Sequence, residues 1–200
     1  MQQTREKIID KSSLLRLWTV EEYHYMAEVG ILGIDESVEL VAGQIIKKMS
    51  PQKTPHATAL TLTRLLLEER LGKQVLVRTQ LPITLSNYSE PEPDVAVVMP
   101  DVLRYLEHHP CVSEIYLIIE IADTTSKTDR EIKTREYGKV GIKDYWVLDI
   151  NKRCLHIFQD PTSHGYQNEI ILEEDGQISP LQFPDLSITV RDLLPPVIVE

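Results

Sequence analysis

The sequence predicts an α/β fold, with a mixed central β-sheet flanked by helices. The most apolar run of the chain, at 115–122, has the character of a buried strand, and a helical segment at 128–140 leads from it to another strand at 144–150. A strand, a helix and a strand in this order form the unit that joins two parallel strands. No linker, repeat or low-complexity segment interrupts the 200 residues. We therefore expect one domain that covers residues 1–200.

Two short elements are predicted near the N-terminus. Thr19-Val-Glu-Glu22 has the spacing of a capping box and opens a short helix that ends near Gly30. The runs 38–41 and 44–49 flank Ala42-Gly43, which predicts a β-hairpin.

A longer helix is predicted from Thr54 to about Leu71. Thr54 is expected to be its N-cap, Pro55 takes the first helical position, and Gly72 stops the helix. The residues expected on its apolar face are Leu62, Leu65, Leu66 and Ala59.

The rest of the chain is expected to supply the sheet. Besides the strand–helix–strand unit, the expected elements are strands at 75–80, 82–85 and 95–98, a short helix at 101–108, a returning hairpin strand at 155–159, a peripheral strand at 166–172 and a terminal element at 188–194. Tyr145 and Trp146 lie on an otherwise apolar strand and are expected in the core.

Composition limits the classes of partner. The chain is 42% hydrophobic and 26% charged, as in ordinary globular proteins. No apolar run approaches the roughly 20 residues of a membrane helix, and the N-terminus lacks a signal-peptide pattern, so we expect a cytoplasmic protein with no membrane partner. The net charge of −10 argues against tight, non-specific binding to nucleic acid. Cys111 and Cys154 are far apart and form no CxxC pair, so we expect reduced thiols and no cysteine nucleophile.

Glu120 is a candidate site residue because it interrupts the apolar run Tyr116-Leu-Ile-Ile-Glu-Ile-Ala122. Continuous apolarity indicates a strand that is covered on both faces, where an unpaired carboxylate is costly. Glu120 is therefore either the ion-pair partner of an arginine near the open end of the strand, or a metal ligand. The C-terminal ends of central strands are where α/β sites tend to lie.

Asp94 favours the second explanation. It follows Pro93, which enforces an extended approach, and directly precedes the strand 95–98. Alone it would be read as a turn cap. Two carboxylates delivered by neighbouring strands, Asp94 and Glu120, form a hard-oxygen site suited to Mg²⁺ or Mn²⁺.

The helix after Glu120 places ionisable side chains on its apolar face. At about 100° per residue, that face carries Ile132, Glu136, Asp129, Val140, Lys133 and Tyr137, and the opposite face carries Glu131, Thr134, Arg135 and Gly138. An Asp129–Lys133 pair at i,i+4 would explain the pairing but not why it faces inward. We predict that Lys133 points toward Glu120, where it could hold an attacking water or stabilise charge on a phosphate.

Several segments together resemble the Uma2 family of endonucleases, which belongs to the PD-(D/E)XK nuclease superfamily. They are Glu90-Pro-Glu-Pro-Asp-Val-Ala-Val97, Ile118-Ile-Glu-Ile-Ala122, Asp129-Arg-Glu-Ile-Lys133 with Tyr137, Gly141-Ile-Lys-Asp-Tyr-Trp-Val-Leu-Asp149, Glu39-Leu-Val-Ala-Gly-Gln-Ile45, and Met49-Ser-Pro51 with His56. The likeness runs from about Thr19 to Leu194.

The resemblance implies a restriction-endonuclease-like fold and a role for each matching residue. Asp94 would be the aspartate of the Pro-Asp pair and Glu120 the second acid, and both would bind the metal. The lysine usual two residues later is replaced by Ala122, so Lys133 on the next helix would supply it. Glu39 would be an acid contributed by the N-terminal part of the fold, unless it is simply a polar residue on the solvent side of its hairpin.

Three more residues are candidates for the site. His56, in the first turn of its helix, either contacts a phosphate or faces solvent. Gln80 could reach the site from its strand, and Asp129 shares a helix face with Lys133.

Two functions from different classes follow. The first is a Mg²⁺-dependent endonuclease that hydrolyses phosphodiester bonds in DNA, with a homodimer expected if both strands are cut; another phosphoester substrate stays open. The second is a catalytically silent binding or assembly protein that kept the nuclease scaffold, which the net charge of −10 also suits.

Overall fold

The computed structural model describes residues 15–48, 53–123 and 127–197, with side chains omitted for residues 127–130. Its centre is a six-stranded sheet in the order β3-β4-β5-β6-β7-β8. The strands are β3 (Leu76–Thr79), β4 (Val95–Val98), β5 (Ile115–Ala122), β6 (Asp144–Asp149), β7 (Cys154–Thr162) and β8 (Gly165–Glu173). The β5–β6 pair is parallel and the other pairs of this sheet are antiparallel. The prediction of a mixed sheet flanked by helices is confirmed.

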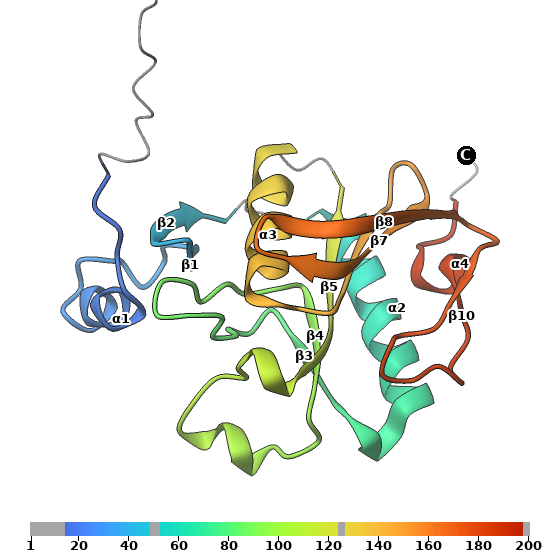
Figure 1. Cartoon of the computed structure of the whole chain (residues 1–200), viewed down its shortest axis with the longest axis horizontal. Coiled ribbons are helices and arrows are strands. Elements are labelled where there is room, and N and C mark those ends of the chain that lie inside the picture. Colours follow the sequence, from blue (N-terminus) through green and yellow to red (C-terminus); the bar gives the residue numbers. More distant parts are fainter. Residues whose placement is uncertain (1–14, 49–52, 124–126, 198–200) are drawn as a thin grey trace, which may run out of the picture.

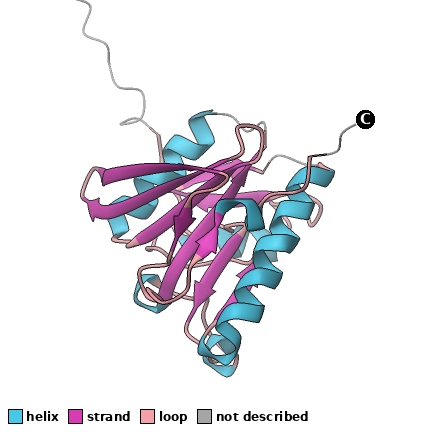
Figure 2. Ribbon diagram, turned by 90° about the vertical axis from the view of Figure 1, so that its right-hand side faces the viewer, coloured by secondary structure: helices cyan, strands magenta, loops and turns pink. Residues whose placement is uncertain are grey.

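The parallel pair is joined by helix α3 (Lys127–Val140), as predicted from the strand–helix–strand order. Residues alternate between the two faces of β5. Leu117, Ile119 and Ile121 pack in the core cluster that includes helix α2 (Thr54–Leu71), whereas Ile118 packs in the cluster that includes Tyr137 of α3. Figure 1 shows β5 between α2 and α3, and Figure 2 shows the long α2 helix beside the sheet. Both faces are therefore covered, which explains the unbroken apolarity of the strand. Tyr145 and Trp146 are fully buried, as predicted.

The apolar face of α2 differs from the prediction. The buried residues are Ala59, Thr63, Leu67 and Leu71. Leu65, expected in the core, is 49% exposed. The leucine-rich segment 60–67 offers apolar side chains on more than one side, so leucines alone did not identify the face that meets the sheet. The N-cap is Lys53, one residue earlier than predicted, and Gly72 ends the helix with φ of 52°.

The N-terminal elements match their predictions. Helix α1 (Val20–Glu28) begins at Thr19 in a complete capping box with Glu22. Strands β1 (Val38–Val41) and β2 (Gln44–Lys47) form the expected hairpin.

The predicted strand 82–85 is absent. Ile83 N–H donates to Pro91 O, Thr84 N–H to Pro110 O and Leu85 N–H to Ser89 O. Because these acceptors lie on different segments, the backbone is satisfied without a ladder.

The remaining elements are short. The predicted helix at 101–108 is a 3₁₀ turn, η3 (Leu103–Leu106), and similar turns are η2 (Gly72–Gln74) and η4 (Val112–Glu114). At the C-terminus lie β9 (Gln177–Ile178), which was not predicted, β10 (Ile188–Thr189) and α4 (Val190–Leu193). None of the described helices combines the length and the apolarity that a membrane span requires.

Gly138 of α3 lies on the buried side of its helix, not on the outer face predicted for it. A Cβ atom at this position would be 2.4 Å from the carbonyl carbon of Gly165, at the start of β8. The helix therefore approaches the β7–β8 hairpin more closely than any side chain at position 138 would allow.

Candidate metal and catalytic site

Three polar residues lie side by side across the sheet. Val95 pairs with Thr79 on one side and with Ile119 on the other. One step further along the same registers, Asp94 lies between Gln80 and Glu120. Directly opposed residues of antiparallel strands project from the same face, and this face is the one that α3 covers. Asp94 is also tied to β5 directly, because its Oδ2 accepts a 2.8 Å hydrogen bond from Ile121 N–H.

Asp94 is held as a carboxylate by its neighbours. His56 Nε2 lies 3.0 Å from Oδ1, and Gln80 Nε2 donates to the same oxygen at 3.2 Å. Burial alone would raise the pKa of Asp94, but the hydrogen bonds from His56, Ile121 and Gln80, with the charge of His56, lower it below its ordinary value. The residue is therefore ionised while largely desolvated.

His56 and Gln80 reach Asp94 through local backbone features. His56 stands in the first turn of α2, whose start lies beside the sheet end. Gln80 follows β3 with φ of 52°, a conformation that few non-glycine residues adopt, and its N–H is bonded to Pro93 O and Asp94 O. Burial lowers the pKa of His56, but contact with Asp94 and the charges of Asp123 and Glu120 raise it overall. His56 contacts Asp94 and its side chain is 14% exposed, so it does not simply face solvent; its contact with a phosphate stays a prediction.

Glu120 is mostly buried, with its side chain 14% exposed, and carries two contacts on one oxygen. Tyr137 OH donates to Oε1 at 2.9 Å, and Lys133 Nζ donates to the same oxygen at 3.2 Å. No described residue donates to Oε2. Burial raises the pKa of Glu120 to about 7; Lys133 and Tyr137 oppose this, while the charges of Asp94 and Glu39 raise it further. Glu120 is thus a carboxyl group whose ionisation is poised near neutrality.

Lys133 links two acids beneath α3. Its Nζ lies 2.9 Å from Glu39 Oε1 and 3.2 Å from Glu120 Oε1, and its side chain is 8% exposed. The predicted orientation of Lys133 toward Glu120 is confirmed, and the proposed arginine partner of Glu120 is replaced by this lysine. The side chain of Asp129 lies outside the described residues.

Glu39 is buried, not on the solvent side of its hairpin. Its other oxygen, Oε2, accepts a 2.9 Å hydrogen bond from Glu92 N–H, in the segment that leads to Asp94. Glu39 therefore ties the N-terminal hairpin both to α3 and to the approach of β4.

Tyr137 is the site residue whose contact with Glu120 the sequence did not indicate. Its pKa is raised well above the ordinary value, first by burial and then by the charge of Glu120. The available signal was its spacing, because Tyr137 follows Lys133 by four residues and shares its helix face.

The donor chemistry fits a hard divalent cation. Among the described residues, no three His, Cys, Asp or Glu side chains converge into a set that could hold a metal alone. Mg²⁺, however, is usually bound through one or two carboxylates and retains several waters. Asp94 and Glu120, on adjacent strands and mutually repulsive, supply such a pair.

Two comparisons relate the chain to known proteins. A family model described as "Uma2: Putative restriction endonuclease" matches residues 20–191. No curated protein matches the chain. A crystal structure from Anabaena variabilis, described as "a putative nuclease belonging to DUF820", is similar with a TM-score of 0.68 and 18% sequence identity, over 88% of this chain and 96% of that one. At this identity the likeness shows a shared fold, while the family model covers most of the sequence. The chain belongs to the Uma2 family.

Proposed function

We propose that this chain is a metal-dependent endonuclease that hydrolyses phosphodiester bonds in DNA. The observation that carries the proposal is Glu120, a buried carboxyl group with a pKa of about 7 that lies opposite Asp94 and has one oxygen without a described donor. A carboxyl group of this kind is costly in a metal-free core. Binding of a cation would remove the cost.

Asp94 and Glu120 are the residues that would hold Mg²⁺ or Mn²⁺. When bound, the ion would supply Lewis-acid chemistry, polarising the phosphate and lowering the pKa of water. Asp94 is prepared for this role by His56 and Gln80, which fix its carboxylate and keep it ionised. Tyr137 holds Glu120 through Oε1, so Oε2, which has no donor among the described residues, would be the oxygen available to a cation.

Lys133 would orient the attacking water or stabilise negative charge on the phosphate. Its amino nitrogen lies 2.9 Å from Glu39 and 3.2 Å from Glu120, so a phosphate held beside Glu120 would be within the influence of this lysine. Glu39 positions this lysine and does not need to contact substrate. The lysine comes from α3 because Ala122 occupies the position two residues after Glu120.

DNA is the proposed substrate, and the net charge of −10 constrains how it binds. Bulk electrostatics oppose association with phosphates. Affinity would therefore depend on the bound ion and on local contacts, and we expect binding without metal to be weak. A homodimer would present two sites for cutting both strands.

A catalytically silent binding protein is the alternative function. It is favoured by the acidic charge and by the internal Glu39–Lys133–Glu120 ion pairs, which already compensate much of the buried charge without a cation.

The test compares wild type with Asp94→Asn and with Asp185→Asn, a change at an exposed aspartate outside the site. We expect wild type and Asp185→Asn to bind Mn²⁺ in calorimetric titration and to nick supercoiled DNA with Mg²⁺ or Mn²⁺, and Asp94→Asn to do neither. Unchanged cleavage by Asp94→Asn would refute the assignment of the site. Absence of both binding and cleavage in wild type would favour the silent scaffold.

A further inference from the structure

Cys154 and His156 lie side by side on β7, two strands away from the site described above. Leu155 and Ile157 face the α2 side of the sheet, so the alternating residues Cys154 and His156 face the α3 side. The His156 ring stacks with Phe158, which belongs to the core cluster of that side. The sulfur of Cys154 lies 3.7 Å from His156 Nε2.

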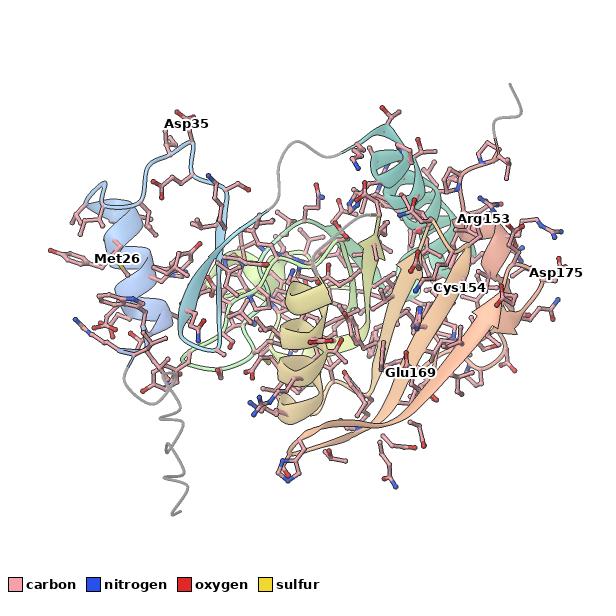
Figure 3. The ribbon with its side chains drawn as sticks, turned by 90° about the horizontal axis from the view of Figure 1, so that it is seen from above. Met26, Asp35, Arg153, Cys154, Glu169 and Asp175 are labelled. Carbon is pink, nitrogen blue, oxygen red and sulfur yellow. The ribbon has the colours of Figure 1, made fainter. Side chains whose placement is uncertain are left out.

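A carboxylate on the neighbouring strand orients the imidazole. His156 Nδ1 lies 2.8 Å from Glu169 Oε1 on β8. A carboxylate requires an N–H at Nδ1, which leaves Nε2 as the nitrogen that faces the thiol. Figure 3 shows Cys154 and Glu169 on the neighbouring strands of the β7–β8 hairpin. The three side chains form a thiol–imidazole–carboxylate series.

This series has the arrangement of an activated nucleophile: a thiol within reach of a base, and a third group that orients the base. We propose that Cys154 is a nucleophilic thiol and a site of modification by small hydroperoxides. The sequence pattern alone predicts no cysteine nucleophile, because neither cysteine stands in a recognisable signature. The proposal is independent of the metal-dependent function.

Burial selects the reagent. Cys154 is 4% exposed, and the His156 side chain is 7% exposed, while the Glu169 side chain is 44% exposed. A reagent of the size of hydrogen peroxide could reach the sulfur through small local openings, whereas a bulky electrophile would be excluded.

Other charged groups near the thiol oppose the formation of thiolate. Asp149 on β6 and Glu173 on β8 are the cross-strand neighbours of Cys154, and α3 packs over β7 and β8. Asp149 is itself bound by Lys152, through a backbone bond of 2.9 Å and an ion pair of 3.7 Å. His156 is in direct contact with the sulfur, so the positive charge that it gains from the thiol proton lies close to the thiolate and opposes the effect of the acids.

The proposed reaction balances without a further reactant. The thiol proton passes to His156 Nε2, and the thiolate sulfur attacks one oxygen of the peroxide. The O–O bond breaks as the S–O bond forms, and the leaving hydroxide takes the proton from the imidazolium to give water. Sulfur is oxidised to sulfenic acid, and the peroxide is reduced.

Cys111 serves as the internal control. Its sulfur contacts Ser113 Oγ at 3.2 Å and is more exposed than that of Cys154. The folded full chain is treated with hydrogen peroxide, catalase stops the reaction at intervals, and the chain is then unfolded in urea with dimedone, so that sulfenic acid at both cysteines is trapped and measured by peptide mass spectrometry. Since a positioned base typically contributes about 100-fold or more and burial offsets part of this, we expect Cys154 to be labelled at least ~10-fold faster than Cys111.

Two variants connect the difference to the proposed series. Glu169→Gln, at a half-exposed position, and His156→Gln should both bring labelling of Cys154 down to the rate of Cys111 or below it. In urea the two cysteines of wild type should react alike. Equal labelling in the native protein, faster labelling of Cys111, or an unchanged rate in folded Glu169→Gln would each overturn the proposal.

Discussion

Tyr137 donates its hydroxyl hydrogen to Glu120 Oε1, the same oxygen that Lys133 contacts. Two donors on one oxygen restrict the rotation of the carboxyl group and leave Oε2 without a donor among the described residues. A buried tyrosine hydroxyl needs a polar partner, so this contact also satisfies Tyr137 itself. The tyrosine thereby orients the acid that we propose as a metal ligand.

Tyr137→Phe should weaken metal binding more than folding. Loss of a group that orients a ligand typically costs about 10–100-fold in metal affinity, whereas loss of one hydrogen bond costs about 1 kcal/mol of stability. Calorimetric titration with Mn²⁺ and urea denaturation measure the two effects. Tyr25→Phe, at a 61% exposed position, is the matched control and should change neither. An unaltered Mn²⁺ affinity in Tyr137→Phe would contradict the orienting role.

Glu120→Gln should change how stability depends on pH. The pKa of Glu120 is about 7 in the folded chain, above the ordinary value of 4.5 for a glutamate. Between these values the folded state holds a proton that the unfolded state releases. The bound proton adds about 3 kcal/mol to the free energy of unfolding. This stabilisation is complete below the pKa of the unfolded chain and is lost as pH rises through the pKa of the folded chain.

The glutamine variant lacks this titration, so without metal it should gain stability relative to wild type as pH rises from about 5 to about 8. Urea denaturation of both proteins at several pH values measures the difference. Parallel stability curves would show that Glu120 does not bind a proton near neutrality.

Lys133→Met should strongly destabilise the fold at neutral pH. The change removes the cation between Glu39 and Glu120 and leaves buried carboxyl groups without their partner, at a cost of about 3–5 kcal/mol. Lowering the pH should reduce the loss, because the acids can then be protonated. Lys139→Met, on the same helix but in an exposed pair with Glu136, should cost at most about 0.5 kcal/mol. Similar losses in both variants would argue against the buried ion pairs.

Gly138→Ala should destabilise the chain even though alanine is the better helix former. Its Cβ would meet the backbone of Gly165 at 2.4 Å, and backbone cannot rotate away. Overpacking of this kind costs about 1–3 kcal/mol. In Gly33→Ala, the nearest atom to the new Cβ is 3.6 Å away on a flexible side chain, so thermal unfolding should show little change. A Gly138→Ala protein as stable as wild type would mean that α3 can shift freely.

The site residues that were predicted best from the sequence are those whose side-chain direction depends on a single helix or strand. Lys133 was placed correctly because a helix has a fixed angular period, and Glu120 because a carboxyl group in an apolar strand needs a partner. Glu39 came only from the family resemblance, since a four-residue hairpin strand has too little pattern to distinguish its buried side.

The residues that sequence located poorly depend on how separate elements meet. Gln80 reaches Asp94 because its φ of 52° turns the chain after β3. A glutamine is not a residue type that predicts such a turn. His56 reaches the same carboxylate only because the start of α2 lies beside the sheet end. The strand predicted at 82–85 failed for a related reason, since its hydrogen-bond acceptors come from two separate segments, one at 89–91 and one at Pro110.

The contact between Gly138 and Gly165 has a consequence for the distant site. Lys133 and Tyr137 both belong to α3, so the distance of their side chains from Glu120 depends on how closely α3 packs on the sheet. The packing distance is limited by the contact between the backbones of Gly138 and Gly165. Neither glycine has a side chain, and neither contacts the acids of the site. The hairpin thus acts as a stop for the helix. Lengthening or bending the hairpin would move Lys133 away from its carboxylates without any substitution among the residues of the site.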